Sequence, residues 1–285
     1  MSNEESTNGS NVSETINAVT GLVKAVPVYQ DAVQPVAKEL GKSFHTVGRA
    51  INVALLPLKG MVWGFEEIEK FFASKLAENL KDVLPEDIVP PRANVAGPAV
   101  EALRYVGHQE ALRDMYANLL ATAMDKNTAD AAHPAFVEII KQLTPDEARL
   151  MTLFIQQRPF PIITVRAESI NKIGGITIAH HLSLFGEQAE VTVKDLVPAY
   201  LGNLDRLGLI SIRDGESYTA IDLYSELEES EHVQHYVTVA AKEVDKVPRL
   251  VKGFVRITDF GAQFGKACVV IRSEMTPDIV ASPHR

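Results

Sequence analysis

Residues 112–125 read LRDMYANLLATAMD, and their apolar side chains recur at i, i+3, i+4, i+7, i+8 and i+11. This spacing predicts an amphipathic helix with one continuous apolar stripe facing a core. The helical pattern already begins at Pro98, and Gly107 predicts a break that divides the segment into two helices. A helical bundle built around this stripe is therefore the expected centre of the fold.

Two more helices are predicted downstream, after a loop at residues 125–133. The first starts near Pro134. The second starts at Thr144-Pro145-Asp146-Glu147, where Thr144 caps the helix, Pro145 suits its first turn and Glu147 completes a capping box. These helices extend to about Gln157, and the sequence predicts a central helical bundle over residues 91–158.

Beyond Pro159 the pattern changes from helical to mixed. Short apolar runs predict strands at 161–165, 209–212 and 253–258, with helices over 194–207 and 260–269. Helix, strand, long excursion and strand is the order of a winged-helix module, in which the excursion forms the wing. We therefore expect a winged-helix-like α+β module over residues 159–285.

The N-terminal third is predicted to consist of a tail, a helical region and a linker. Residues 1–14 are rich in Ser, Asn and Glu and predict a disordered tail, and their acidic character argues against a secretory signal. Residues 15–90 follow a helical pattern with several Gly and Pro breaks. Four prolines between Leu84 and Pro98 predict a helix-free linker. The expected fold is mainly α with a C-terminal α+β part, a helical bundle followed by a winged-helix-like module.

The segment 50–65, AINVALLPLKGMVWGF, has Lys59 as its single charged residue. It is too short for a spanning helix, which needs about 20 apolar residues. A buried hairpin bent at Pro57 is the favoured interpretation; an oligomer interface and a membrane-surface segment are the alternatives. The candidate interface or membrane residues are Leu55, Leu56, Pro57, Met61 and Trp63.

Composition limits the classes of function. The chain has 285 residues, a formal net charge of −9 and one cysteine, Cys268. An acidic chain needs a local basic patch to bind phosphate, so composition disfavours nucleic-acid binding. A single cysteine excludes an intrachain disulfide and is compatible with the cytoplasm.

No residue pattern predicts catalysis, a cofactor or a metal. Asp146 and Glu147 are explained by capping at a helix N-terminus, where negative charge is stabilised. The histidine pairs at 180–181 and 232–235 match no strong ligand motif, and we expect them to be solvated loop residues. The sequence lacks the nucleophile-elbow, dinucleotide and phosphate-loop motifs, and Cys268 lies in an apolar run typical of a buried thiol. The expectation is that the protein is not an enzyme.

One basic strip is a weak candidate for contacting phosphate. It follows the acidic run 221–235, which contains no Lys or Arg, and we expect the two runs to offset each other or to be solvated. The predicted recognition helix at 194–207 has no net charge and few side chains suited to reading bases. The strip consists of Lys242, Lys246, Arg249, Lys252 and Arg256.

Several of these stretches resemble the abortive infection alpha family. They are the proline-rich lead-in from Pro90, LRDMYANLLATAMD at 112–125 and HPAFVEIIKQLTPDEARLM at 133–151. LGNLDRLGLI at 201–210, ITDFGAQFGKACV at 257–269 and the N-terminal INVALLPLKGMVWGFEEIEKFF at 51–72 are similar too. Each stretch is a packing or capping pattern of modest specificity, and it is their order that carries the resemblance.

The resemblance implies a bacterial protein of abortive phage infection and supplies no catalytic residue. We expect a non-enzymatic phage-defence protein that binds another macromolecule, with a host or phage protein as its partner. A membrane-perturbing effector using residues 50–65 and a winged-helix transcriptional regulator are the alternatives. The expected location is cytoplasmic or peripheral to the inner membrane, and homo-oligomerisation is left open.

Overall fold

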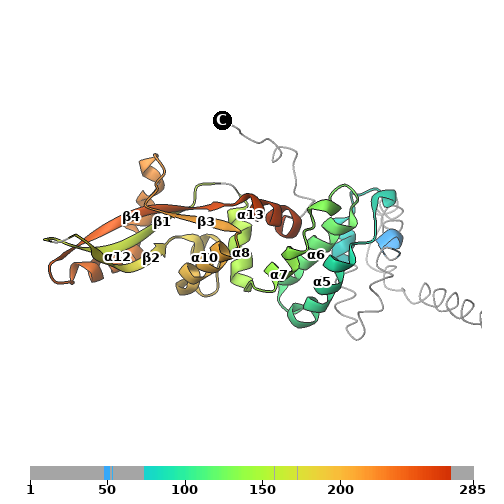
Figure 1. The fold of residues 1–285 in the computed structure, drawn as a ribbon, viewed down its shortest axis with the longest axis horizontal. Helices are drawn as coiled ribbons and strands as arrows, with labels where there is room; N and C mark the ends of the chain where they lie inside the picture. The colour runs from blue at the N-terminus through green and yellow to red at the C-terminus, as the bar shows by residue number, and fades with distance from the viewer. Residues whose placement is uncertain (1–47, 52, 54–73, 157, 172, 271–285) are drawn as a thin grey trace, which may run out of the picture. The chain divides into compact units, whose positions relative to one another are not determined.

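The computed structural model describes residues 48–51, 53, 74–156, 158–171 and 173–270 (Figure 1). All of them belong to one compact unit, Thr46–Arg285. The described chain is mainly helical and has a four-stranded antiparallel sheet in its C-terminal part. The coarse fold class predicted from the sequence is therefore confirmed.

The first part of the unit is helical, and its central helix is the one predicted from the apolar stripe. The predicted break at Gly107 is confirmed, because Gly107 follows the last residue of one helix and the next begins at Glu110. The helix-free linker is wrong, since a helix begins at Ala93 and contains Pro98. Pro98 removes only one backbone donor there, and the helix retains a buried face. The elements are η1 (Pro85–Asp87), α5 (Ala93–Val106), α6 (Glu110–Met124), η2 (Ala129–Ala131), α7 (Ala135–Ile140) and α8 (Pro145–Phe154).

The predicted capping box at the start of α8 is confirmed. The Glu147 amide donates to Thr144 Oγ1 at 3.2 Å, and the Thr144 amide donates to the Glu147 carboxylate at 2.6 Å. Two amides that the helix itself leaves without acceptors are satisfied in this way. The entry into α8 is thus fixed by local sequence.

The sheet contains the three predicted strands and one that was not predicted. Its order is β2-β1-β4-β3, and every neighbouring pair is antiparallel. The unpredicted strand is β2, and β4 begins seven residues before the predicted strand at 253. The strands are β1 (Pro161–Ser169), β2 (Gly175–Leu182), β3 (Ile210–Asp214) and β4 (Lys246–Ile257).

The winged-helix-like arrangement is not confirmed. The excursion between β3 and β4 is mostly helical, and its helices pack against the sheet instead of extending as a wing. The acidic run 221–235 lies within these helices, and Ser230 caps one of them by accepting from the Val233 amide. The elements between and after the strands are α9 (Phe185–Gln188), η3 (Lys194–Leu196), α10 (Val197–Arg206), η4 (Ile221–Leu223), α11 (Ser225–Glu229), α12 (Glu231–Ala241), α13 (Asp259–Phe264) and the π-helix η5 (Gly265–Val269).

One hydrophobic core joins the helical part to the sheet. It contains Leu119 of α6, Phe154 of α8 and Ile162 of β1, all fully buried. The end of the described chain is also fastened to α6, because Asn118 Nδ2 donates to the Cys268 carbonyl at 3.0 Å and Thr122 Oγ1 to the Ala267 carbonyl at 3.1 Å. The helical part and the sheet are therefore packed as one body.

Candidate functional site

The two faces of the sheet have different surroundings. One face buries Ile163 and Val165 beneath α11 and α12, in a second hydrophobic cluster. The other face buries Ile162 in the main core, but from Thr164 onward it carries polar side chains. Residues two apart on a strand share a face, so Ile162, Thr164 and Arg166 form one row that passes from the core to an open surface.

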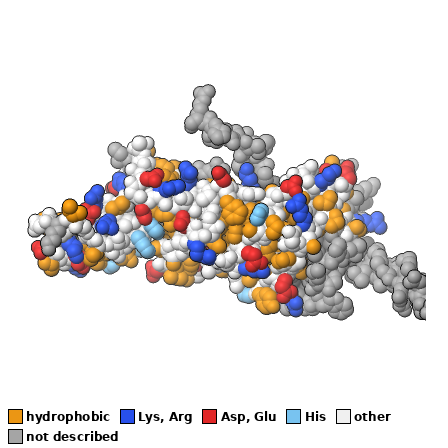
Figure 2. Space-filling view, viewed as in Figure 1, with side chains coloured by type: hydrophobic (Ala, Val, Ile, Leu, Met, Phe, Trp, Pro, Cys, Tyr) orange, Lys and Arg blue, Asp and Glu red, His pale blue; other side chains and the backbone are white. Residues whose placement is uncertain are grey.

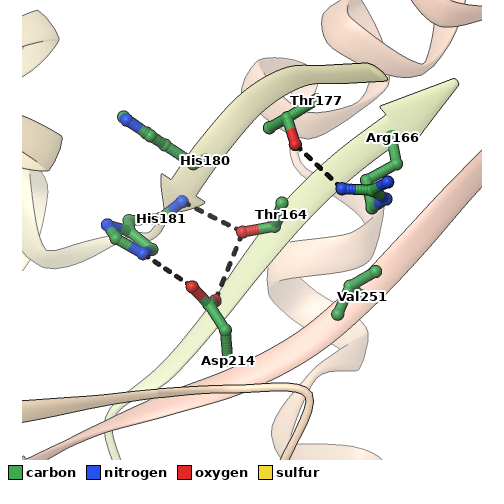
Figure 3. A pocket seen from close by; sticks show the side chains of 7 residues that line it. All are labelled: Thr164, Arg166, Thr177, His180, His181, Asp214 and Val251. Atoms are coloured by element: carbon green, nitrogen blue, oxygen red, sulfur yellow. Dashed lines mark hydrogen bonds and ion pairs between the residues drawn. The ribbon is translucent and has the colours of Figure 1, made fainter. Parts of the chain in front are cut away.

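A pocket of about 470 Å³ lies on this open part of the sheet. Side chains from all four strands line it (Figure 3). The register brings them together, because Arg166 is opposite Thr177 and Thr164 is opposite Val251. We call it the sheet pocket; its lining residues are Thr164, Arg166, Thr177, His180, His181, Asp214 and Val251.

His181 and Asp214 connect the two edge strands across the pocket. His181 Nε2 and Asp214 Oδ2 are 2.9 Å apart, and Thr164 Oγ1 donates to the other Asp214 oxygen at 3.4 Å (Figure 3). His181 has a φ of +55°, and the β1–β2 pairing is irregular beside it. Few residues other than glycine adopt this conformation. Here the bulge turns the imidazole over the sheet, toward Asp214.

Arg166 is held in place at the other side of the pocket. Its Nη1 donates to Thr177 Oγ1 at 3.0 Å and its Nη2 to the Gly175 carbonyl at 3.4 Å. Glu168 lies 3.6 Å from Arg166 Nε and also accepts from Arg249 Nη1 at 2.9 Å. The guanidinium group is thus oriented by β2 on one side and by a shared carboxylate on the other.

The electrostatics of the pocket favour a neutral His180. Burial lowers its pKa, the neighbouring His181 lowers it further, and Asp214 opposes both effects without cancelling them. The rings of His180 and His181 are stacked at 4.9 Å with an interplanar angle of 13°. A neutral imidazole has one donor and one acceptor nitrogen, so His180 can hydrogen-bond a ligand in either sense.

The polar groups of the sheet pocket are not in the order found in a hydroxyl-activating triad. Thr164 contacts Asp214, and Asp214 contacts His181, so the carboxylate lies between the hydroxyl and the imidazole. A histidine that activates a hydroxyl must instead lie between the hydroxyl and the carboxylate. Among the described residues, no group of three or more His, Cys, Asp or Glu side chains is arranged to hold a metal ion.

A second feature is a group of exposed aliphatic side chains, from both faces of the sheet and from its turns, at one end of the sheet. The turn between β1 and β2 and the start of β4 meet there, and the Ile170 amide donates to the Asp245 carbonyl at 3.0 Å (Figure 1). Figure 2 shows hydrophobic and charged side chains side by side at this end of the sheet. We call it the apolar tip; its members and exposed fractions are Ile170 (60%), Ile173 (108%), Ile176 (44%), Val244 (80%) and Val247 (48%).

The residues of the predicted basic strip lie on both faces of the sheet. Alternation along β4 places Arg249 on the face of the sheet pocket, and Lys252 and Arg256 on the opposite face. Lys246 pairs with Glu243 at 3.2 Å, and Lys252 pairs with Glu228 at 2.8 Å. Lys242, which follows α12, and Arg256 are both exposed.

The candidate segment 50–65 falls almost entirely outside the described residues. Ile51 is buried and Val53 is 65% exposed. The five candidate residues of the sequence analysis lie outside the described residues: Leu55, Leu56, Pro57, Met61 and Trp63.

Three other expectations have an outcome in the structure. Cys268 is buried, as predicted, and burial raises the pKa of its thiol well above the ordinary value. Asp146 lies in the first turn of α8, as expected, but its carboxylate accepts from the Thr192 and Val193 amides at 3.0 and 3.2 Å, outside that helix. The pair His232 and His235 lies on α12, in a helix and not in a loop.

The sheet pocket and the apolar tip were not predicted from the sequence. A signal for β2 exists in the alternation of Ile176, Thr177 and Ile178 after the Gly174-Gly175 turn. Recognising that strand would have placed Thr177 beside Arg166. Asp214 gives no such signal, because its strand is separated from β2 by two others.

Neither curated proteins nor solved structures give a match that identifies this chain. Among curated proteins no match was found. One solved structure, titled "Structure of the uncharacterized protein from the hydrocarbon-degrading marine bacterium Alcanivorax borkumensis SK2", is 18% identical and covers 51% of this chain and 96% of its own. Its TM-score of 0.33 does not establish a shared fold.

Within the described residues, no helix is both long and apolar enough to cross a membrane. The family model described as abortive infection alpha matches residues 64–268, which include every strand of the sheet and both of its covering helices. The chain therefore belongs to the abortive infection alpha family.

Proposed function

We propose that this protein protects bacteria from phage by abortive infection, and that it acts without catalysis by docking its apolar tip on another protein. Membership of the abortive infection alpha family supports the defence role. The observation that carries the mode of action is the exposure of five aliphatic side chains at one end of the sheet. Exposed apolar side chains gathered at one end of a folded protein favour that end as an interaction site.

The partner is a protein and not a lipid surface. Trp and Tyr are enriched among the residues that anchor proteins at the membrane–water interface. The apolar tip, as defined above, consists of Ile and Val. The whole chain has a net charge of −9, which repels anionic lipid. The apolar tip fits an apolar depression of matching shape on a protein surface.

Charge around the apolar tip defines the partner further. Lys242, Lys246 and Arg249 lie in and before the start of β4, against Glu243 and Asp245. Lys246 pairs with Glu243 and Arg249 with Glu168, so the charges at this end of the sheet largely balance, although the chain as a whole is acidic. We infer a partner with an apolar centre and a rim carrying charges of both signs, since complementary charge steers association and fixes orientation.

The experiment combines phage challenge with variants of the tip. Cells expressing the protein are infected with a phage panel, and plaque formation and cell survival are measured. Ile173→Glu and Val244→Glu are expected to abolish protection without lowering the melting temperature, because substitutions of exposed side chains change stability by only about 0.5 kcal/mol. The matched control is Leu84→Glu, which places the same charge on an aliphatic residue that is 59% exposed outside the tip.

Different outcomes of these experiments distinguish the proposal from its alternatives. Protection that survives both tip substitutions would reject the docking surface, and a wild-type protein that protects against no phage would reject the defence role. Flotation with vesicles of neutral or anionic phospholipid that depends on Ile173 would identify a membrane as the target instead. Self-association that Ile173→Glu abolishes would make the partner a second copy of this chain.

A further inference from the structure

We propose that the sheet pocket is a binding site for a small molecule carrying an oxyanion group, a phosphate or a carboxylate, held by Arg166, His180 and Thr177. The pocket is distinct from the apolar tip, and the inference does not depend on the proposed function. Its volume of about 470 Å³ lies within the range of small-molecule sites in proteins, about 300–1,000 Å³.

The guanidinium group of Arg166 has a fixed orientation and retains N–H donors that can bind an anion. Thr177 Oγ1 and the Gly175 carbonyl fix its orientation, and together with Glu168 they engage only part of its five N–H donors. A planar fork held in one orientation matches the two oxygens of a carboxylate or phosphate. Arg249, directly opposite Arg166 in the register, adds a second positive charge on the same face.

The carboxylates near the pocket already have hydrogen-bond or ion-pair partners within the protein. Both oxygens of Asp214 have partners, one in Thr164 and the other in His181. Glu168 is shared between Arg166 and Arg249. The groups left to meet a ligand are therefore mainly donors, and donors recognise an oxyanion.

The remaining lining residues offer hydrogen-bonding groups and an apolar surface to a ligand. The His180 ring is stacked on His181, and both rings line the pocket with Thr177, while Val251 provides the hydrocarbon surface (Figure 3). A few placed polar groups around apolar surface is the usual composition of a small-molecule site. The ligand's oxyanion would contact Arg166, and its remaining atoms would lie over Val251 toward the two imidazoles.

The test uses the full chain and simple probes. Inorganic phosphate and sodium acetate are titrated separately at constant ionic strength, and the imidazole resonances of the eight histidines are followed by NMR. Saturable shifts confined to His180 and His181 are expected from the probe whose oxyanion matches the ligand. Saturation with phosphate alone identifies a phosphate-bearing ligand, and saturation with acetate alone identifies a carboxylate-bearing one.

Variants separate the site from general charge effects. Arg166→Gln is expected to weaken binding tenfold or more, while Arg158→Gln, with the same change in net charge, leaves binding unchanged. Arg158 contacts Gln188 and the Phe160 ring, away from the pocket. Thr177→Val, at an exposed position, is expected to weaken binding in a chain that keeps its fold. The proposal is overturned if neither probe saturates, or if Arg158→Gln weakens binding as much as Arg166→Gln.

Discussion

His181 on β2 and Asp214 on β3 lie 2.9 Å apart, although β1 and β4 separate their strands in the sheet. The two edges of the sheet are therefore connected over its face, which is possible because the sheet curls. Thr164 on β1 completes the bridge by contacting both residues. The concave surface beneath this bridge is the sheet pocket.

Removing the charge of Asp214 tests how much this bridge stabilises the fold. Asp214→Asn is expected to lower the free energy of unfolding by less than about 1 kcal/mol, because the Asp214 side chain is 47% exposed and exposed ion pairs are weak. Chemical denaturation measures the change, and Asp195→Asn is the exposed control. A loss of several kcal/mol would show that the bridge holds the sheet together.

The capping box of α8 predicts a modest effect on stability alone. Thr144→Ala removes the acceptor for the Glu147 amide and is expected to cost about 0.5–2 kcal/mol. Thermal unfolding measures this loss, and protection against phage should persist at permissive temperature. Lost protection at an unchanged melting temperature would assign Thr144 a direct role in function.

Asp146 predicts a pH dependence of stability. Burial raises the pKa of its carboxyl, but hydrogen bonds from Thr192, Val193 and Arg149 outweigh burial, and the net shift is downward. A lowered folded-state pKa stabilises the protein above the unfolded value of about 3.9, and this contribution is lost as pH falls through the folded value. The stability difference between wild type and Asp146→Asn should therefore shrink from pH 5 toward pH 2 in denaturant titrations. A difference that stays constant over this interval would contradict the assignment.

Two glycines predict opposite effects of the same substitution. A Cβ at Gly261 would lie 1.8 Å from the Leu209 carbonyl oxygen, whereas one at Gly202 would meet nothing within 4 Å. Gly261→Ala is expected to destabilise by about 1–3 kcal/mol or more, because backbone must move. Gly202→Ala, within α10, should stabilise by about 0.4–1 kcal/mol. Differential scanning calorimetry of both variants checks the pair, and equal effects would refute the close packing of α13 on Leu209.

The sequence predicted the elements whose signals are local. The α6 stripe, the break at Gly107 and the Thr144 cap depend on residues within a few positions of one another, and all three are confirmed. The first half of β4 was assigned to a basic strip, because Lys246, Arg249 and Lys252 interrupt its apolar pattern. Those residues are tolerated in a strand since each pairs with a carboxylate.

The sheet pocket and the apolar tip depend on pairings between distant residues. Arg249 is opposite Arg166 in the register, and the Ile170 amide reaches Asp245, yet nothing local in the sequence specifies either partner. The helices between residues 221 and 241 were likewise not predicted, because the acidic composition of this segment resembles that of a solvated loop. Sequence patterns establish the elements here, and strand register establishes the candidate sites.

The hydrogen bond from Asn118 to the Cys268 carbonyl also limits when folding can be completed during synthesis. The two residues are 150 positions apart, so α6 leaves the ribosome long before the carbonyl that its buried amide needs. Contacts of such sequence separation slow folding, because the intervening chain must be closed before they form. During that interval the α6 surface meant for η5 is open, and a nascent chain halted before Gly265 would expose it to chaperones and proteases. The chain must therefore be synthesised at least as far as η5 before this surface of α6 is covered.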